Sequence, residues 1–386
     1  MQYRTLGRTG VQVSSLALGT MNFGSFGSTT EAETTAMVRR ALDAGVNLID
    51  TADAYSGGVS EELVGRALKG VDRDEVVLAT KFRLPLGDIS RLGEMKGPAV
   101  MNRQGGSRRW IVKAVEDSLR RLDTDRIDLY QMHRPDPTTD IEESLSALTD
   151  LQRAGKILYI GTSTFSAAEM VEAQWVSERR RLARFATEQP PYSILVRGIE
   201  ADVLPTARKY GMGVLTWSPL ASGFLSGKYR PGGAVEQSYR DRLAAGRPMP
   251  PATADDARKR EAAEQLYTLA EENGMSLVEM SLAFVTGHPA VTSALIGPRT
   301  MEQLDAQLAC GDRVLSGELL DRIDEIVAPA ARSGRPTPTR STRRLSRPVA
   351  AAEPPARPPP EPDGGRRSGV RNGAPTEPST AVRSRT

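Results

Sequence analysis

The sequence predicts an α/β fold, a (β/α)8 TIM barrel with an N-terminal β-hairpin and a disordered C-terminal tail. Short runs rich in Val, Ile and Leu alternate eight times with amphipathic segments. Several of the amphipathic segments end on glycine, and the composition changes abruptly after residue 331. Parallel strands with right-handed helical crossovers, eight in number, typically close into a barrel.

The first element is the segment YRTLGRTGVQVS, which holds two short runs about a glycine-bearing turn. This pattern is typical of a hairpin. Because it precedes the first apolar run, we expect it to cover the floor of the barrel.

The eight apolar runs have the length of strands and are apolar throughout, as expected for strands with both faces buried. We expect these strands at residues 16–20, 46–52, 76–82, 127–133, 157–163, 184–189, 213–219 and 293–298.

The segments between the strands have helical spacing, and a glycine at the end supplies the left-handed residue that terminates a helix. Clear examples lie at residues 31–45, 107–122 and 141–155. An open, doubly wound sheet is the alternative architecture. It requires a Gly-x-Gly-x-x-Gly loop directly after the first strand, and GTMNFGSFG lacks that spacing.

The C-terminal segment is rich in Arg, Pro, Ser, Thr and Gly. Such a composition cannot bury enough apolar surface to offset the entropy of ordering, so the sequence predicts a barrel domain at 1–330 and a disordered tail at 331–386. Twelve arginines and four acidic residues lie in 332–386, whereas the whole chain has a net charge of only +3. The basic character thus belongs to the tail, which disfavours nucleic acid as a partner of the barrel. We expect the tail to be solvated without a specific partner, and an arm that binds nucleic acid or an anionic surface is the alternative.

The remaining composition excludes several classes of protein. One cysteine permits no intramolecular disulfide, and no Cys/His cluster predicts a structural zinc site. The N-terminus lacks a signal-peptide pattern, and no apolar stretch is long enough to cross a membrane. We therefore expect a cytoplasmic protein with no membrane partner, as a monomer or a homo-oligomer.

Ionisable residues occur at the ends of three consecutive predicted strands. Asp50 ends the second strand and leads to Tyr55, Lys81 ends the third, and His133 ends the fourth. Each has a structural alternative, as a helix cap, a solvated strand end or a core histidine. Because the active site of a (β/α)8 barrel lies at the carboxyl ends of its strands, the set predicts a catalytic site.

The four residues suit proton transfer. A tyrosine titrates near pH 10 in peptides, and an adjacent ammonium such as Lys81 favours the phenolate and lowers that pKa. Asp50 would keep Lys81 charged and oriented, and His133 would hold a substrate oxygen. Gly57 and Gly58 would let the backbone pass close to a ligand.

The sequence resembles the aldo-keto reductase family over nearly all of residues 1–330. The resemblance rests on YRTLGRTGVQVS, LGTMNFG, NLIDTADAYSGGVSEELVGRAL, ATKF, SLRRLDTDRIDLYQMHRPD, WSPLASGFLSGKY and ALIGPRTMEQL. It implies a barrel that reduces aldehydes and ketones with NADPH and without metal. It places the family's catalytic tetrad on Asp50, Tyr55, Lys81 and His133, with Tyr55 as the general acid.

The resemblance also implies the cofactor contacts. Ser163 and Gln189 would bind the carboxamide, and Trp217 would stack on the nicotinamide ring. The strap over the pyrophosphate would comprise Ser218, Leu220, Ser222 and Lys228. The segment that binds the adenosine 2′-phosphate and adenine would comprise Gly297, Arg299, Gln303 and Gln307. The guanidinium of Arg299 favours NADPH over NADH, because it can grip a 2′-phosphate. Thr164 departs from the family, which often has Asn there.

Two long loops, 84–106 and 230–256, are expected to shape the substrate pocket and to cover the cofactor. Phe23, Phe26 and Phe82 suit either a pocket lining or core packing. Cys310 and His288 lie outside the strand-end set and have no expected catalytic role.

Two other functions fit the same residues. One is a nicotinamide-sensing regulatory module with little turnover, because some members of the family serve as channel subunits. The other is a Schiff-base aldolase acting through Lys81. That chemistry needs a lysine of lowered pKa, whereas Asp50 would hold it charged.

Overall fold

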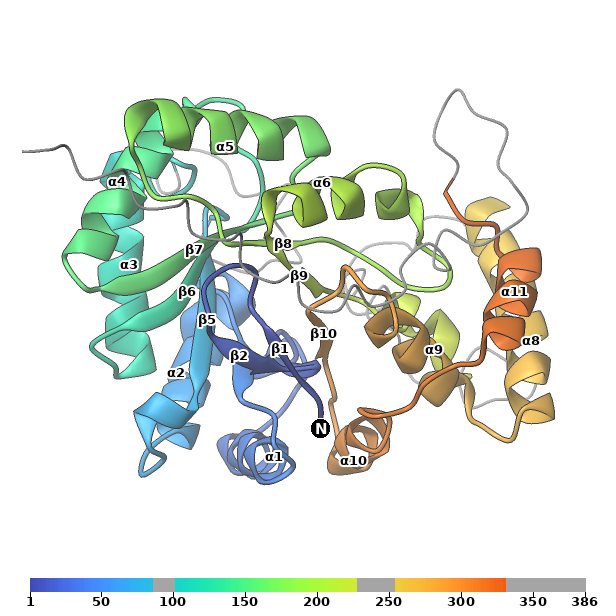
Figure 1. The fold of residues 1–386 in the computed structure, drawn as a ribbon. Coiled ribbons are helices and arrows are strands. Elements are labelled where there is room, and N and C mark those ends of the chain that lie inside the picture. Colours follow the sequence, from blue (N-terminus) through green and yellow to red (C-terminus); the bar gives the residue numbers. More distant parts are fainter. Residues whose placement is uncertain (86–100, 228–253, 331–386) are drawn as a thin grey trace, which may run out of the picture. The chain divides into compact units, whose positions relative to one another are not determined.

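The computed structural model describes residues 1–85, 101–227 and 254–330. The predicted tail, the middle of the 84–106 loop and nearly all of the 230–256 loop lie outside the described residues. Within them, eight parallel strands close into a barrel in the order β10-β3-β4-β5-β6-β7-β8-β9. The predicted (β/α)8 architecture is thus confirmed, and the sheet is not open (Figure 1).

β7 has the predicted bounds, and the other strands are shorter than predicted. The strands span β3 Leu16–Gly19, β4 Leu48–Asp50, β5 Val77–Phe82, β6 Ile127–Met132, β7 Ile157–Ser163, β8 Thr187–Gln189, β9 Gly213–Thr216 and β10 Ser293–Ile296. The run expected at 213–219, for example, leaves the ladder after Thr216, and Trp217 keeps only an isolated bridge to Pro191. Apolar character beyond that point belongs to the rim of the barrel, where backbone pairing ends.

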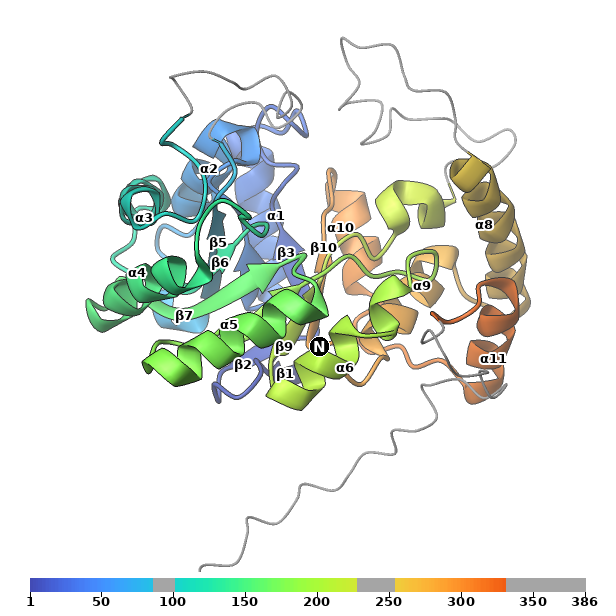
Figure 2. The ribbon, with the colours of Figure 1, turned by 90° about the horizontal axis from the view of Figure 1, so that it is seen from above.

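The helices follow the strands in turn and surround them (Figure 2). They are α1 Glu31–Asp43, α2 Val59–Ala67, α3 Arg108–Leu122, α4 Ile141–Arg153, α5 Ala167–Arg180, α6 Val203–Tyr210, α8 Ala254–Glu272, α9 Leu277–Thr286, α10 Met301–Leu308 and α11 Gly317–Ile326. Hydroxyl side chains begin several of them: Thr30, Ser166 and Ser276 each form a capping box with a glutamate three residues on.

The N-terminal hairpin closes one end of the barrel. Strands β1 (Tyr3–Thr5) and β2 (Gln12–Ser14) pair antiparallel. Leu6 and Val13 pack against residues that point into the barrel, including Leu48 and Leu129. The amide of Ser14 donates to Asn47 just before β4, at 2.8 Å. The hairpin therefore covers the amino ends of the strands, as predicted, and leaves the carboxyl ends for a site.

A larger core lies between the strands and the helices. Phe23 and Phe82 are fully buried there, and Phe82 stacks on Tyr130 with ring centroids 4.8 Å apart. Of the two roles considered for these phenylalanines, the structure supports core packing for both, whereas Phe26 is only half-buried. Among the described helices, none is long and apolar enough to cross a membrane.

Candidate active site at the carboxyl ends of the strands

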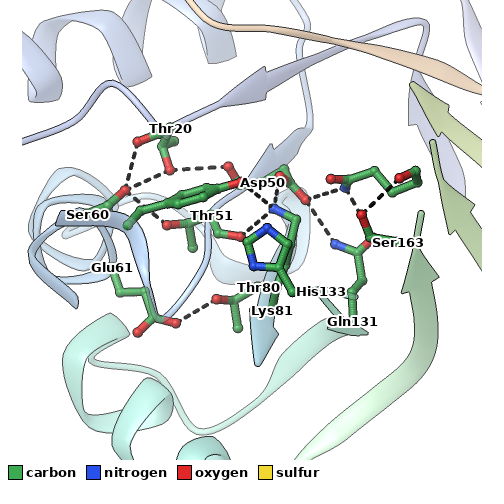
Figure 3. Close-up of polar contacts among 12 residues, drawn as sticks. Thr20, Asp50, Thr51, Ser60, Glu61, Thr80, Lys81, Gln131, His133 and Ser163 are labelled. Atoms are coloured by element: carbon green, nitrogen blue, oxygen red, sulfur yellow. Dashed lines mark hydrogen bonds and ion pairs between the residues drawn. The ribbon is translucent and has the colours of Figure 1, made fainter. Parts of the chain in front are cut away.

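Lys81 lies at the centre of a buried polar cluster at the carboxyl ends of the strands (Figure 3). It is the penultimate residue of β5, and strand alternation points it into the barrel above Ala79. Its ammonium donates to Asp50 Oδ1, to the carbonyl of Thr51 at 2.8 Å and to the hydroxyl of Tyr55 at 3.2 Å. All three ammonium donors are therefore used.

Asp50 ends β4 and is held on both carboxylate oxygens. Oδ1 accepts from Lys81, while Oδ2 accepts from Gln131 Nε2 at 2.9 Å and from Gln189 Nε2 at 2.8 Å. The three donors come from β5, β6 and β8. These hydrogen bonds fix the orientation of the Asp50 carboxylate, which in turn holds the Lys81 ammonium in place.

Tyr55 opens a short 3-10 turn, η1 (Tyr55–Gly58), that precedes α2. Ser56, Gly57 and Gly58 all have positive φ, so the chain turns sharply and presents the Tyr55 ring toward Lys81. A side chain at Gly58 would meet Arg121 at 2.8 Å. Gly58 has a φ of 101°, which favours glycine, and its lack of a side chain leaves room for Arg121.

Helix α2 is fixed to the barrel by its first turn. Buried Glu61 accepts from Thr80 Oγ1 on β5 and from Arg121 Nε on α3, both at 2.6 Å. The Ser60 hydroxyl lies 2.9 Å from Thr20 Oγ1 and 3.0 Å from Thr51 Oγ1. These bonds hold the turn that carries Tyr55 against β4 and β5, and Figure 3 shows those of Glu61 with Thr80 and of Ser60 with Thr20 and Thr51.

The pKa of Tyr55 departs from the sequence-based expectation. Burial raises it, the Lys81 ammonium lowers it, and the net pKa lies above the usual tyrosine value. The expectation that Lys81 brings it down toward neutrality is wrong, because removal from water outweighs one paired ammonium. The phenol is therefore protonated near neutral pH. Since its oxygen accepts from Lys81, its own proton can be donated elsewhere.

The titration of Lys81 contradicts an aldolase mechanism. Burial alone would lower the pKa of Lys81, but Asp50 and Tyr55 together raise it above the usual value. A Schiff-base lysine must lose its proton near neutral pH. The charged state of Lys81 therefore argues against a Schiff-base aldolase.

His133 directly follows β6, and its ring meets the ring of Tyr55 edge-on, with centroids 5.7 Å apart. Burial lowers its pKa well below the usual value, and Lys81, Arg134 and Arg83 lower it further. The imidazole is therefore neutral, and one of its nitrogens carries a proton that can be donated to an oxygen.

Ser163 and Gln189 join this cluster at the ends of β7 and β8. The Ser163 hydroxyl donates to the Gln189 carbonyl at 2.9 Å and accepts from Arg134 at 3.3 Å. The Arg134 guanidinium also lies over the Trp217 ring, 5.7 Å from its centroid. The predicted carboxamide residues and the predicted stacking residue are thus connected to His133 through its neighbour in sequence.

The other predicted cofactor residues lie on two neighbouring strand ends. Ser218 and Ser222 have positive φ in the loop after β9, and Leu220 precedes the turn η5 (Ala221–Ser226). Gly297 follows β10, where its carbonyl accepts from Asn22 at 2.8 Å. Gln303 on α10 accepts from the Arg299 amide at 3.0 Å, and Gln307 lies one turn further on. Lys228 lies outside the described residues.

Several predicted contact residues carry buried polar atoms that have no hydrogen-bond partner in the described part of the chain. These atoms are Nδ1 of His133, Nε1 of Trp217 and Oε1 of Gln307. A buried polar atom without a partner costs free energy unless a ligand or water satisfies it. Donors and acceptors spread along this rim fit an extended polar ligand such as a nicotinamide dinucleotide.

Cys310 and His288 are placed away from this rim. Cys310 is buried on the α10 side, where its thiol donates to the carbonyl of Ala306 and burial raises its pKa to about 11. His288 follows α9 and accepts from the amide of Ala290. The described residues contain no group of three His, Cys, Asp or Glu side chains that could hold a metal ion.

Two residues of the cluster are absent from the sequence-based prediction. Gln131 contacts Asp50, and Arg134 joins His133 to Ser163 and Trp217. Strand alternation offered a signal for Gln131, because it lies two residues before His133 on the same face of β6. No pattern signals Arg134, since its contacts reach segments far away in the sequence.

The fold and the cluster together define a (β/α)8 barrel with a buried polar site at the carboxyl ends of its strands. Residues 15–328 match the model of the Aldo/keto reductase family. The chain is 39% identical over 333 residues to the Uncharacterized oxidoreductase YrpG of Bacillus subtilis (strain 168), covering 84% of this chain and 96% of that protein.

Two further relatives have names that indicate other roles. A Probable voltage-gated potassium channel subunit beta of Oryza sativa subsp. japonica is 35% identical over 339 residues, which is 85% of this chain and 97% of that protein. The Versiconal hemiacetal acetate reductase of Aspergillus parasiticus is 31% identical over 343 residues, or 86% and 98%. The chain therefore belongs to the aldo/keto reductase family and is an oxidoreductase that acts on carbonyl compounds. The family uses NADH or NADPH.

Proposed function

We propose that this protein reduces an aldehyde or ketone to an alcohol with NADPH, and that Tyr55 is the general acid. The observation that carries the proposal is the Tyr55 hydroxyl, which accepts from Lys81 at 3.2 Å while burial keeps it protonated. Its proton is available to a substrate oxygen at the mouth of the barrel.

The surrounding residues prepare that proton transfer. As the proton leaves, negative charge develops on the Tyr55 oxygen, and the adjacent ammonium of Lys81 stabilises it. Asp50 keeps Lys81 charged and oriented through its direct contact. Neutral His133, whose ring lies against Tyr55, donates to the same substrate oxygen and orients the carbonyl.

NADPH supplies a hydride to the carbonyl carbon when it is bound. Ser163, Gln189 and Trp217 would hold its nicotinamide end, and Ser218, Leu220, Ser222 and Lys228 its pyrophosphate. Gly297, Arg299, Gln303 and Gln307 would hold the adenosine end. Arg299 supports NADPH over NADH, because a guanidinium can form a forked pair with the 2′-phosphate.

The proposal is tested by mixing the full-length protein with NADPH and 4-nitrobenzaldehyde, phenanthrenequinone or methylglyoxal. We expect the nicotinamide absorbance to fall with at least one of these carbonyl compounds. NADH at the same concentration should support a slower reaction. If no compound consumes NADPH, the proposed function is wrong.

A regulatory role is a second candidate, because one relative is named as a probable potassium channel subunit. In that case the barrel would bind NADPH and report its redox state to a partner, with little turnover. The cluster around Tyr55 supports turnover instead. Tight NADPH binding without consumption of any carbonyl compound would favour the regulatory role.

A further inference from the structure

Gln131 occupies the middle of the buried cluster and has no role in the mechanism above. It lies on the inward face of β6 and is fully buried. Its Nε2 donates to Asp50 Oδ2 at 2.9 Å, and its Oε1 accepts from Gln189 Nε2 at 3.2 Å. The side chain thus connects β4 with β8 through the interior of the barrel, as Figure 3 shows for Gln131 and Asp50.

The chemistry of these three groups fixes which way each amide points. The Asp50 carboxylate, paired with Lys81, can only accept hydrogen bonds. Gln131 and Gln189 therefore both turn their NH2 groups toward it. With its nitrogen committed, Gln131 presents its oxygen to Gln189, which uses its second N–H there.

As a consequence, Gln189 has one polar atom left. Both of its N–H donors are used inside the barrel, while its Oε1 has no donor assigned in the described part of the chain. An amide oxygen held in this way accepts a hydrogen bond and repels another acceptor. A ligand that meets it gains if it brings an N–H group.

We propose that Gln131 is a positioning residue: it fixes the amide of Gln189 so that the oxygen faces the cofactor, and the site thereby selects the NH2 group of the nicotinamide carboxamide. This inference rests on the proposed NADPH-dependent function. Without Gln131, the second N–H of Gln189 loses its acceptor. The Gln189 amide is then held only by its hydrogen bond to Asp50, and its oxygen is no longer fixed in one direction.

The test compares three ligands by quenching of tryptophan fluorescence. They are NADPH, its 3-acetylpyridine analogue, which has a methyl ketone in place of the carboxamide, and 2′-phospho-ADP-ribose, which lacks the nicotinamide. Wild-type protein should prefer NADPH to the analogue. In Gln131→Leu this preference should fall by about threefold to tenfold, the range expected for one neutral hydrogen bond. Binding of 2′-phospho-ADP-ribose should stay unchanged.

Two further variants keep the test decisive. Gln131→Met retains the length of the side chain and serves if the leucine variant folds poorly. Gln174→Leu is the matched control, because Gln174 is a buried glutamine on α5 that donates to the Phe185 carbonyl, away from the site. The control should keep the wild-type preference even if it lowers stability.

The outcomes separate this inference from the proposed function. Wild-type protein that fails to bind NADPH contradicts the proposed function. If wild-type protein binds NADPH but does not prefer it to the acetylpyridine analogue, or if both Gln131 variants keep the full preference, only the role of Gln131 is overturned. Equal weakening of all three ligands also overturns it, because a general loss of packing would produce that result.

Discussion

Two buried cations in this protein have similar partners but different surroundings. Lys81 pairs with Asp50 at the mouth of the barrel. Arg197, before α6, donates to both carboxylate oxygens of Glu200, at 2.9 and 3.1 Å, and to Asp324 on α11 at 2.7 Å. In both cases burial alone would lower the pKa, and the neighbouring carboxylates raise it above the usual value.

The difference lies in where each hydrogen-bond chain ends. The Arg197 cluster ends without an available proton: the guanidinium also bonds the Val327 carbonyl, and the Tyr192 hydroxyl donates its proton to Glu200 at 2.6 Å. Its remaining buried atom in the described residues, Oδ2 of Asp324, can only accept a hydrogen bond. The Lys81 cluster ends on the hydroxyl of Tyr55, whose proton is still available. The direction of a lysine or arginine pKa shift therefore does not distinguish a catalytic pair from a structural pair. What distinguishes them is whether the hydrogen-bond chain ends on a group with a proton that it can still donate.

Removal of that terminal proton should have the largest effect. Tyr55→Phe keeps the ring but loses the donor, so kcat should fall by about 10²–10⁴-fold. NADPH binding should persist, because the hydroxyl is not among the predicted cofactor contacts. Stopped-flow reduction and fluorescence titration measure the two quantities. A kcat near the wild-type value would remove Tyr55 from its role.

The same substitution at the two cations should separate their functions. Lys81→Met should reduce kcat by about 10²-fold or more, since the Tyr55 anion loses its neighbouring charge. Arg197→Met should leave kcat per folded molecule unchanged but lower the free energy of unfolding by about 3–5 kcal/mol, because Glu200 and Asp324 lose their buried cation. Urea unfolding and steady-state kinetics on both variants test this reversal. Similar kinetic losses in the two variants would contradict it.

Glu188 extends the comparison to a buried carboxylate that has no cation among its hydrogen-bond partners in the described part of the chain. It accepts from Thr162 Oγ1 at 2.5 Å and from the Phe165 amide at 3.1 Å, and burial raises its pKa to about 7. The folded state therefore keeps the proton that the unfolded chain releases near pH 4.5. Stability from this group is fully present below that pH and is lost as the pH rises toward 7.

The expected loss is about 3 kcal/mol between pH 4.5 and 7. It is measured as the difference in urea unfolding free energy between wild-type protein and Glu188→Gln, which cannot titrate there. The free energy of unfolding of the variant should increase relative to that of the wild type as the pH rises. A difference that stays constant with pH would show that Glu188 is already ionised at pH 5.

The smallest expected effect concerns the backbone beside the cluster. Thr164 has a φ of 60°, a conformation that a β-branched side chain adopts at a cost and that asparagine adopts more readily. Thr164→Asn should therefore raise the free energy of unfolding by about 1 kcal/mol. Chemical denaturation tests this, and a loss of stability would show that the threonine side chain contributes more than its backbone costs.

The sequence predicts the parts of the site that follow from local pattern. Apolar runs locate the strands, and the polar residue that ends each run locates Asp50, Lys81 and His133. The direction of the Tyr55 pKa could not be predicted, because it depends on how completely the surrounding loops exclude water. The bond between Arg197 and Asp324 was also beyond local pattern, since 127 positions separate the two residues.

The hydrogen bond between Gln189 and Asp50 joins residues 139 positions apart. Strands β4 and β8 are four places apart in either direction around the barrel, so the bond spans its diameter. It can form only after both halves of the chain have come together, and contacts of such long range are completed slowly during folding. The catalytic cluster is therefore a product of barrel closure. Recovery of enzyme activity on refolding should follow recovery of helical structure and mark the last step of assembly.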